Sequence, residues 1–423
     1  MGRDGGHHHQ PGAATSRGLA PVITLPGTGW RTAAGLRRIV ASLRADGGDV
    51  RVVGGAVRDT LLGLPVTDID LATPLLPQEV TQRLEAADIK VIPTGIAHGT
   101  VTAIASGEHY EITTLRRDVE TDGRRATIAF AGDWREDAAR RDFTINALYC
   151  DPDSGRVDDW FGGIADLEAG CIRFIGDAVT RIAEDHLRIL RFYRFAARFG
   201  RGDLEPVSHA AVIAARQSLK SLSRERVADE LLKILSLADP RPIVAQMASD
   251  GIFEVILPEL APDFAAALDR LLANEAASGV APAPLRRLSA LLPADAAMAD
   301  QVASRLRFST RQRKHLAALA AHRGTTEMPV RQFAYAVGLE TARDVRLLVG
   351  DTASASTAIR TLENWAVPVL PVKGRDVIMH GVSAGPDVAR ILKSVEKAWV
   401  EEDFPDRPRA LELVDQMIGR SSD

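Results

Sequence analysis

Two aspartates, Asp68 and Asp70, are spaced so that their carboxylates can act together. They lie in the segment TDIDLA, residues 67–72, whose pattern predicts a short β-strand. On a strand, residues i and i+2 point to one face. Two adjacent carboxylates repel each other unless a cation lies between them, and Mg²⁺ commonly takes one or two carboxylates together with substrate phosphates. The pair therefore predicts a Mg²⁺ site, with two solvated aspartates in a turn as the alternative.

Two glycines and an arginine precede this pair in the chain. Gly54-Gly55 ends a predicted strand and opens a helix, and Arg58 follows one turn later. Glycine lets a phosphate approach the backbone, and a helix N-terminus offers N–H donors. Gly55 and Arg58 therefore predict a phosphate-binding turn, with an ordinary turn as the alternative. Glu111, on a neighbouring predicted strand, is a provisional third acidic ligand; holding an arginine in place is an equally weighted role for it.

A second charged segment, residues 140–147, reads RRDFTINA and combines cations, a carboxylate and an amide. Such a set can hold phosphate oxygens and ribose hydroxyls together. Arg141 and Asp142 are the candidates within it. The alternative is an exposed helix start that Asp142 caps.

Four further candidates follow a helical pattern predicted from Val179 to Phe199: Asp185, Arg188, Arg191 and Arg194. A carboxylate and a guanidinium one turn apart can meet the edge of a nucleobase. Asp185 and Arg188 are therefore expected to read a base, and Arg191 and Arg194 to reach its triphosphate. Ordinary salt bridging on a solvated helix, for example between Glu184 and Arg188, is the alternative.

These residues need a small sheet and helices to position them. Strands are expected at Val50–Val53, Ile69–Ala72, Lys90–Ile92, Thr100–Ala105 and Tyr110–Leu115, with helices at Leu36–Leu43, Ala56–Leu62 and Pro77–Ala87. Beyond about residue 164 strand signals nearly vanish and Ala/Leu/Arg-rich helical patterns take over. The fold class is therefore α+β: a small mixed-sheet domain followed by a long helical region.

Composition limits the classes of protein to which the chain can belong. It has 423 residues, 46% of them hydrophobic and 26% charged, and a net charge of −4. No apolar stretch approaches the length of a membrane span, and two cysteines are too few for a disulfide scaffold. We expect a cytoplasmic protein without membrane attachment. With this net charge, nucleic acid can bind only at a local basic face.

Several motifs in order resemble the class II tRNA nucleotidyltransferase and bacterial poly(A) polymerase family. They are GGAVRDTLLG, DIDLAT, GIAHGTVT, RRDFTINAL, EDHLRILRFYRFAARF and LSRERVADELLKIL, and they span residues 52 to about 235. The segment PVKGRDVIMHGVSAGPDVARIL resembles the family's tail more loosely.

The resemblance implies a nucleotidyltransferase head of the polymerase-β type and an elongated, all-helical neck, body and tail. The expected boundaries are a disordered N-terminal tail at 1–20, head 21–163, neck 164–236, body 237–345 and tRNA-binding tail 346–423. Residues 116–134, which include DGRR at 122–125, are expected to form a flexible loop.

By position, the resemblance assigns roles to the same residues. Asp68 and Asp70 would bind two catalytic Mg²⁺ ions, with Glu111 provisional. Gly55 and Arg58 would contact the triphosphate, Arg141 and Asp142 the phosphate and ribose, Asp185 and Arg188 the base, and Arg191 and Arg194 the phosphates.

The expected activity is the template-independent addition of CMP, CMP and AMP to the 3′ end of tRNA from CTP and ATP, with release of pyrophosphate. No obligate protein partner is inferred. The alternatives are a poly(A) polymerase or A-adding enzyme of the same family and, from another class, a non-catalytic RNA-binding protein. A cluster of cations from Arg305 to Lys314 is one possible face for tRNA phosphates, and a solvated helix surface is an equal alternative.

Overall fold

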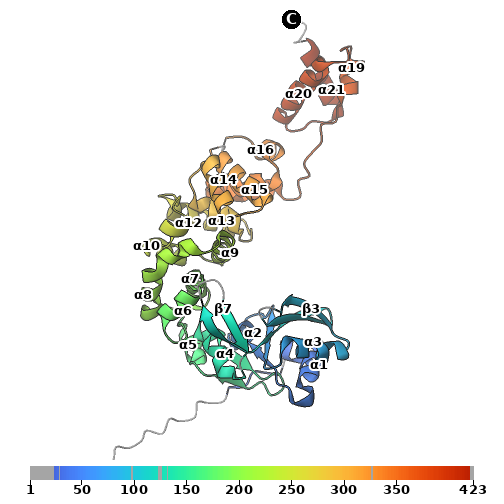
Figure 1. Ribbon diagram of the computed structural model, residues 1–423. Helices are drawn as coiled ribbons and strands as arrows, with labels where there is room; N and C mark the ends of the chain where they lie inside the picture. The colour runs from blue at the N-terminus through green and yellow to red at the C-terminus, as the bar shows by residue number, and fades with distance from the viewer. Residues whose placement is uncertain are drawn as a thin grey trace, which may run out of the picture. The chain divides into compact units, whose positions relative to one another are not determined.

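The computed structural model describes residues 23–27, 29–96, 99–121, 126–130, 132–324 and 327–419. The chain divides into two compact units, Met1–Ala169 with Arg173–Asp177 and Gly170–Ile172 with Ala178–Asp423. A mixed sheet lies in the first unit, and helices follow it along the chain (Figure 1). The predicted α+β class is confirmed. The predicted tail at 1–20 and the DGRR segment at 122–125 lie outside the described residues.

The first unit is built on a seven-stranded sheet in the order β3-β4-β5-β2-β1-β8-β9. Only β2 and β5 pair in parallel; the other neighbours are antiparallel. The strands are β1 (Arg51–Val53), β2 (Ile69–Thr73), β3 (Lys90–Gly95), β4 (Thr100–Ala105), β5 (Glu108–Thr114), β8 (Leu148–Cys150) and β9 (Val157–Asp159). The five strands predicted from the sequence are all present.

The segment predicted as a loop before Trp134 forms a separate two-stranded antiparallel ribbon. It consists of β6 (Arg116–Thr121) and β7 (Ala126–Phe130). The expectation of a loop was therefore wrong for these two flanks, because cross-strand pairing satisfies their backbone groups.

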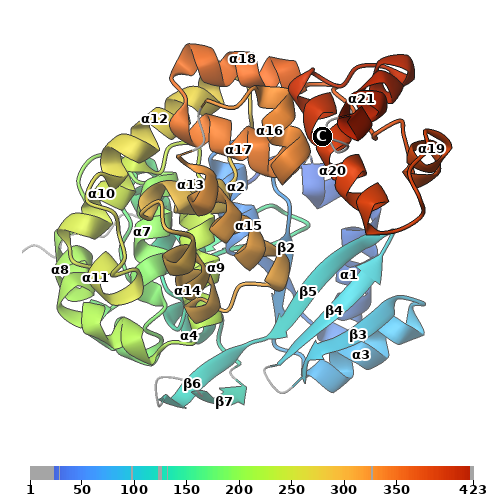
Figure 2. The same ribbon diagram turned by 90° about the horizontal axis from the view of Figure 1, so that it is seen from above.

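Helices lie on both faces of the sheet. The α-helices described in this unit are α1 (Ala34–Arg44), α2 (Gly55–Leu61), α3 (Pro77–Ala86), α4 (Trp134–Ala139) and α5 (Gly163–Ala169). Helices α1, α2 and α3 pack on one face, and α4 packs on the other. In α1, Leu36, Ile39, Val40 and Leu43 recur at helical spacing and are buried. They pack with α3 against β4 (Figure 2).

Strand alternation divides the sheet residues between two apolar clusters. Val52 and Leu71 belong to the cluster under α1 and α3, whereas Val53 and Ala72 belong to a second cluster with Tyr149. Because successive strand residues point to opposite faces, Asp70 lies on the face of this second cluster.

The second unit is helical. Its helices are α6 (Ala178–Glu184), α7 (Arg188–Phe199), α8 (Pro206–Ala215), α9 (Arg224–Leu235), α10 (Arg241–Ser249), α11 (Phe253–Ile256), α12 (Phe264–Ala277), α13 (Pro284–Leu291), α14 (Ala296–Arg305), α15 (Thr310–His322), α16 (Val330–Val337), α17 (Leu339–Val349), α18 (Thr352–Leu362), α19 (Gly374–Met379), α20 (Pro386–Glu401) and α21 (Arg407–Gly419). A buried ionic network joins several of them: Glu275 of α12 accepts hydrogen bonds from Arg286 and Arg287 of α13, and Arg286 also donates to Asp344 of α17.

Candidate active site

The central strands place the predicted carboxylates next to one another. Asp70 lies opposite Val53 of β1 and Glu111 of β5, so Asp70 and Glu111 share one face of the sheet. Asp68 immediately precedes β2 and accepts a 3.0 Å hydrogen bond from the Thr67 hydroxyl. All three carboxylate residues are exposed. The sheet therefore brings together the acidic residues that the strand spacing predicted.

The surroundings of Asp70 raise its pKa. Partial shielding of the carboxylate from solvent by neighbouring atoms is the first cause, although the residue as a whole remains exposed. Repulsion from Glu111 and Asp68 also raises the pKa, and attraction to Arg141 opposes the shift. Such mutual repulsion is what a bound divalent cation relieves, and carboxylate oxygens are suitable ligands for it. Within the described ranges, no three acidic, His or Cys side chains converge into a ready-made metal site. The residues fit a cation held mainly by Asp68 and Asp70, and nothing tests Glu111 as a ligand.

The glycine turn lies at the edge of the same face. Gly54, at φ 69°, donates its N–H to Leu148 O and precedes α2. A Cβ at Gly54 would lie 3.4 Å from Arg141 Nη1, so glycine leaves room for that guanidinium. Arg58 is buried and donates to Asp59 at 2.8 Å and Asn146 at 2.5 Å. Arg58 therefore braces the turn that Gly55 opens.

A buried carboxylate that the sequence reasoning missed, Asp137, anchors Arg141. Tyr149 accepts a 2.9 Å hydrogen bond from Arg141 Nε and donates a 2.5 Å hydrogen bond to Asp137. Arg140 also donates to Asp137, and so does the backbone N–H of Arg116 at the start of β6. Asp137 is 1% exposed. Burial alone would raise its pKa, but Arg140 and Arg141 outweigh burial and lower it.

Asp142 lies beside this anchor. Its Oδ1 accepts hydrogen bonds from the Phe143 N–H at 2.8 Å and from Asn146 Nδ2 at 3.0 Å. Asp142 and Arg58 thus hold the same asparagine from two sides. The pairing of Asp137 with Arg141 could have been predicted from the sequence, because the two residues have the i, i+4 spacing at which helical side chains meet.

The predicted Val179–Phe199 helix is two helices, and the expectation of one was wrong. α6 ends at Glu184 and α7 begins at Arg188. Asp185 lies in the break, where its carboxylate accepts a 3.1 Å hydrogen bond from the Leu187 N–H. Aspartate favours such breaks because its side chain competes for backbone donors.

Counter-charges hold the other candidates of this segment. Asp185 accepts a 2.7 Å bond from Arg226 of α9, and Arg194 donates at 2.6 Å to the buried Glu230 of the same helix. Sequence reasoning missed both partners. Arg188 donates to Glu184 at 2.6 Å, which is the salt bridge weighed as the alternative.

The remaining arginine, Arg191, lies over the Phe195 ring at 5.4 Å. The candidates on α2 and β2 and those of residues 140–147 belong to the first unit, and those of residues 185–194 belong to the second.

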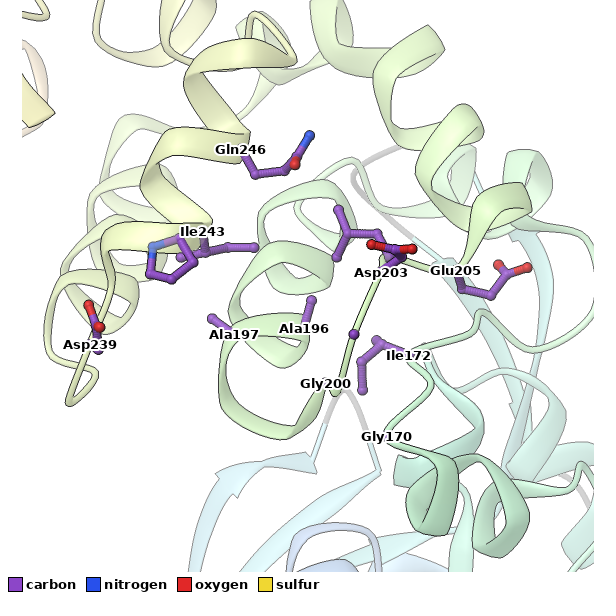
Figure 3. Close-up of a pocket in the computed structure, with 13 residues that line it drawn as sticks. Gly170, Ile172, Ala196, Ala197, Gly200, Asp203, Glu205, Asp239, Ile243 and Gln246 are labelled. Atoms are coloured by element: carbon purple, nitrogen blue, oxygen red, sulfur yellow. The ribbon is translucent and has the colours of Figure 1, made fainter.

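A cavity of about 350 Å³ lies in the second unit, among α7, α8 and α10 (Figure 3). Ala196 and Ala197, near the C-terminal end of α7, and Gly200, directly after it, line the cavity. The carboxylates of Asp203, Glu205 and Asp239 also line it (Figure 3). None of the predicted site residues does, and the acidic lining disfavours a nucleotide triphosphate there.

The cation cluster from Arg305 to Lys314 is largely paired with acids. Arg305 pairs with Glu259 at 2.5 Å, Arg311 with Glu340 at 3.2 Å, and Arg313 with Asp300. None of the helices among the described residues has both the length and the hydrophobicity of a membrane span.

Two family models match the chain. A poly(A) polymerase head domain model matches residues 50–173, and a model described as the probable RNA and SrmB-binding site of polymerase A matches residues 203–264. The first covers the carboxylates, the glycine turn and Arg141. The second begins after α7.

Relatives extend the similarity over most of the chain. The mitochondrial CCA tRNA nucleotidyltransferase 1 of Mus musculus is 31% identical over 88% of this chain and 87% of its own length. The CCA-adding enzyme of Levilactobacillus brevis is 32% identical over 89% of this chain and 95% of its own.

Solved structures agree with these relatives. The crystal structure of the Bacillus stearothermophilus CCA-adding enzyme in complex with CTP matches with a TM-score of 0.74 and 28% identity. The match covers 92% of this chain and 98% of that one. With this similarity over nearly its whole length, the chain belongs to the family of CCA-adding tRNA nucleotidyltransferases.

Proposed function

We propose that this protein adds CMP, CMP and AMP to the 3′ end of tRNA from CTP and ATP and releases pyrophosphate. The observation that carries the proposal is the relationship to CCA-adding enzymes over nearly nine-tenths of the chain. The clustering of Asp70 with Asp68, Glu111 and Arg141 on one face of the sheet supports it chemically.

In this proposal Asp68 and Asp70 hold Mg²⁺, which would lower the pKa of the RNA 3′-hydroxyl and neutralise the departing pyrophosphate when bound. Arg141, held by Tyr149 and Asp137, presents its guanidinium to the phosphates. Gly55 and Arg58 form the turn that receives the triphosphate. Arg58 also stabilises this turn through its hydrogen bond to Asn146.

Nucleotide choice is assigned to Asp185 and Arg188. Their planar groups can pair with the hydrogen-bonding edges of cytosine and adenine. Asp185 has to share or release Arg226, and Arg188 has to share or release Glu184, when a base binds. Arg191 and Arg194 are assigned to the triphosphate, with Glu230 setting the orientation of Arg194.

Incubation with Mg²⁺ and a tRNA that lacks its 3′ CCA tests the activity. With single nucleotides supplied and the ends sequenced, we expect CTP incorporation to stop after two residues, followed by one A. A long A-tract without C would instead assign the protein as a poly(A) polymerase. The head domain description makes poly(A) synthesis the second candidate. Addition of A alone would indicate an A-adding enzyme.

A substitution tests the metal ligands. Asp70→Ala should abolish transfer and leave tRNA affinity nearly intact, because the carboxylate acts on the reacting groups. Glu85→Ala, an exposed carboxylate of α3, is the matched control and should transfer normally. Transfer that survives Asp70→Ala would disprove the metal assignment, and loss of tRNA binding together with transfer would point to a folding defect.

The division into head 21–163, neck 164–236, body 237–345 and tail 346–423 also stays a proposal, as does a cytoplasmic location. The two family-model matches, at 50–173 and 203–264, are compatible with a head followed by a separate helical module.

A further inference from the structure

A cavity of about 400 Å³ in the second unit is lined by two arginines from different helices. Arg270 comes from α12 and Arg323 follows the last turn of α15. Asp263, just before α12, contributes the carboxylate of the lining, and Ala290, Leu292 and Leu348 contribute apolar surface. The volume is sufficient for a small anion with several water molecules.

The two arginines differ from most of their neighbours in having no acidic partner. Among the residues that the structure describes, no carboxylate lies within ion-pairing distance of Arg270 or Arg323, whereas Arg286, Arg287, Arg305 and Arg313 all have one. Arg323 donates to Leu292 O and to Ser289 Oγ, each at 2.7 Å, and its buried Nε has no hydrogen-bond partner. Arg270 donates only a long 3.3 Å bond to Leu348 O.

The charge of Arg323 is therefore poorly compensated. Burial lowers the pKa of Arg323 to about 10; attraction to Asp263 opposes this shift, and repulsion from Arg270 adds to it. A guanidinium that is partly buried without a counter-charge lowers the stability of the fold, because its loss of hydration is not offset by an ion pair. An anion in the cavity would supply that charge to both arginines.

We propose that this cavity binds a phosphate group between Arg270 and Arg323. A guanidinium fork matches a phosphate in geometry and charge, and each arginine keeps N–H donors that are not used within the protein. The phosphate is supplied either by the backbone of a bound RNA or by free phosphate or pyrophosphate. The RNA source rests on the proposed function, and the free-anion source does not.

Two variants with opposite expected effects test the site. Arg270→Gln removes a cation without touching the bonds of Arg323, and we expect it to weaken binding at least fivefold. Asp263→Asn removes the opposing carboxylate and should strengthen binding. Arg360→Gln, an exposed arginine of α18 that donates to Thr357, is the matched control and should change nothing.

Two measurements on the full-length protein distinguish the sources. Calorimetric titration with inorganic phosphate or pyrophosphate, in EDTA so that the carboxylate pair of the sheet holds no metal, reports the free anion. Affinity for tRNA lacking CCA, measured across salt concentrations, reports the RNA backbone, and Arg270→Gln should lower the salt slope by about one. Opposite effects of the two variants in either measurement support the site and name its source.

The proposal is overturned if Arg270→Gln and Asp263→Asn behave like Arg360→Gln in both measurements. It is also overturned if both variants shift binding in the same direction, since that result indicates a change of folding. Extension of tRNA ends by the wild-type protein is scored separately, so failure of this site and failure of the proposed activity remain distinguishable.

Discussion

Replacing Tyr149 with Phe isolates the anchor of Arg141. The change deletes one hydroxyl, and with it the bond from Arg141 Nε and the bond to Asp137. The ring and its edge-on contacts with Trp134 and Trp160 remain. Asp137 keeps Arg140 and the Arg116 N–H, so its charge stays compensated.

The magnitude follows from the bonds that are lost. A hydrogen bond to a charged group contributes about 1.5–3 kcal/mol, so the free energy of unfolding should fall by about 2 kcal/mol. Arg141 loses its main orienting contact, and a loss of ~1.4 kcal/mol of phosphate binding is a tenfold weaker affinity. We therefore expect KM to rise roughly tenfold for CTP and for ATP alike, because both carry the same triphosphate.

Steady-state incorporation of each nucleotide into tRNA checks this expectation, with urea unfolding as the stability measure. Tyr335→Phe is the matched control, because it also removes a tyrosine bond to a carboxylate, that of Glu396, within the second unit. It should leave both KM values unchanged. A Tyr149→Phe enzyme with normal KM values, or with a rise for one nucleotide only, would refute the assignment of Arg141 to the phosphates.

Three further outcomes are expected. Glu111→Gln removes a negative charge next to Asp70 and should lower the raised pKa of Asp70, so that its ionised, metal-binding form persists to lower pH. The acid limb of the pH–rate profile should move to lower pH with kcat retained. A large loss of kcat would instead indicate that Glu111 is a metal ligand. Arg188→Ala should blur the choice between CTP and ATP by at least fivefold in competition assays, and unchanged selectivity would contradict its role. Arg287→Met should lower the free energy of unfolding by about 1–3 kcal/mol, because the carbonyls of Leu235 and Leu237 lose their donor while Glu275 keeps its pair with Arg286; chemical denaturation measures this.

Five strands of the sheet and its carboxylates could be predicted because their signals are local, whereas the three-residue strands β8 and β9 were not predicted. Alternation along the strand fixes the face of Asp70, and the register with β5 then places Glu111 beside it. The break at Asp185 could not be predicted from periodicity, because apolar residues continue on both sides of it. A side chain that bonds the Leu187 N–H ends the first helix.

The sequence reasoning did not predict the oppositely charged partners that lie far along the chain from the candidate residues. Arg226 is 41 residues from Asp185, and Glu230 is 36 residues from Arg194. Such pairs depend on the packing of α9 against α7, which no local pattern encodes. Tyr149 was missed for a different reason: it is only eight residues from Arg141, but it lies on β8, a strand that was not predicted.

The Asp137 carboxylate links the proposed phosphate-binding arginine, Arg141, to the first residue of the β6–β7 ribbon, Arg116. Asp137 accepts from Arg141, which faces the phosphates in our proposal, and from the Arg116 N–H, where the β6–β7 ribbon leaves the sheet. A displacement of the ribbon at Arg116 would therefore shift the Asp137 carboxylate that orients the Arg141 guanidinium. A substitution that displaces the hairpin, even one that makes no contact with a nucleotide, should therefore change the affinity for the triphosphate.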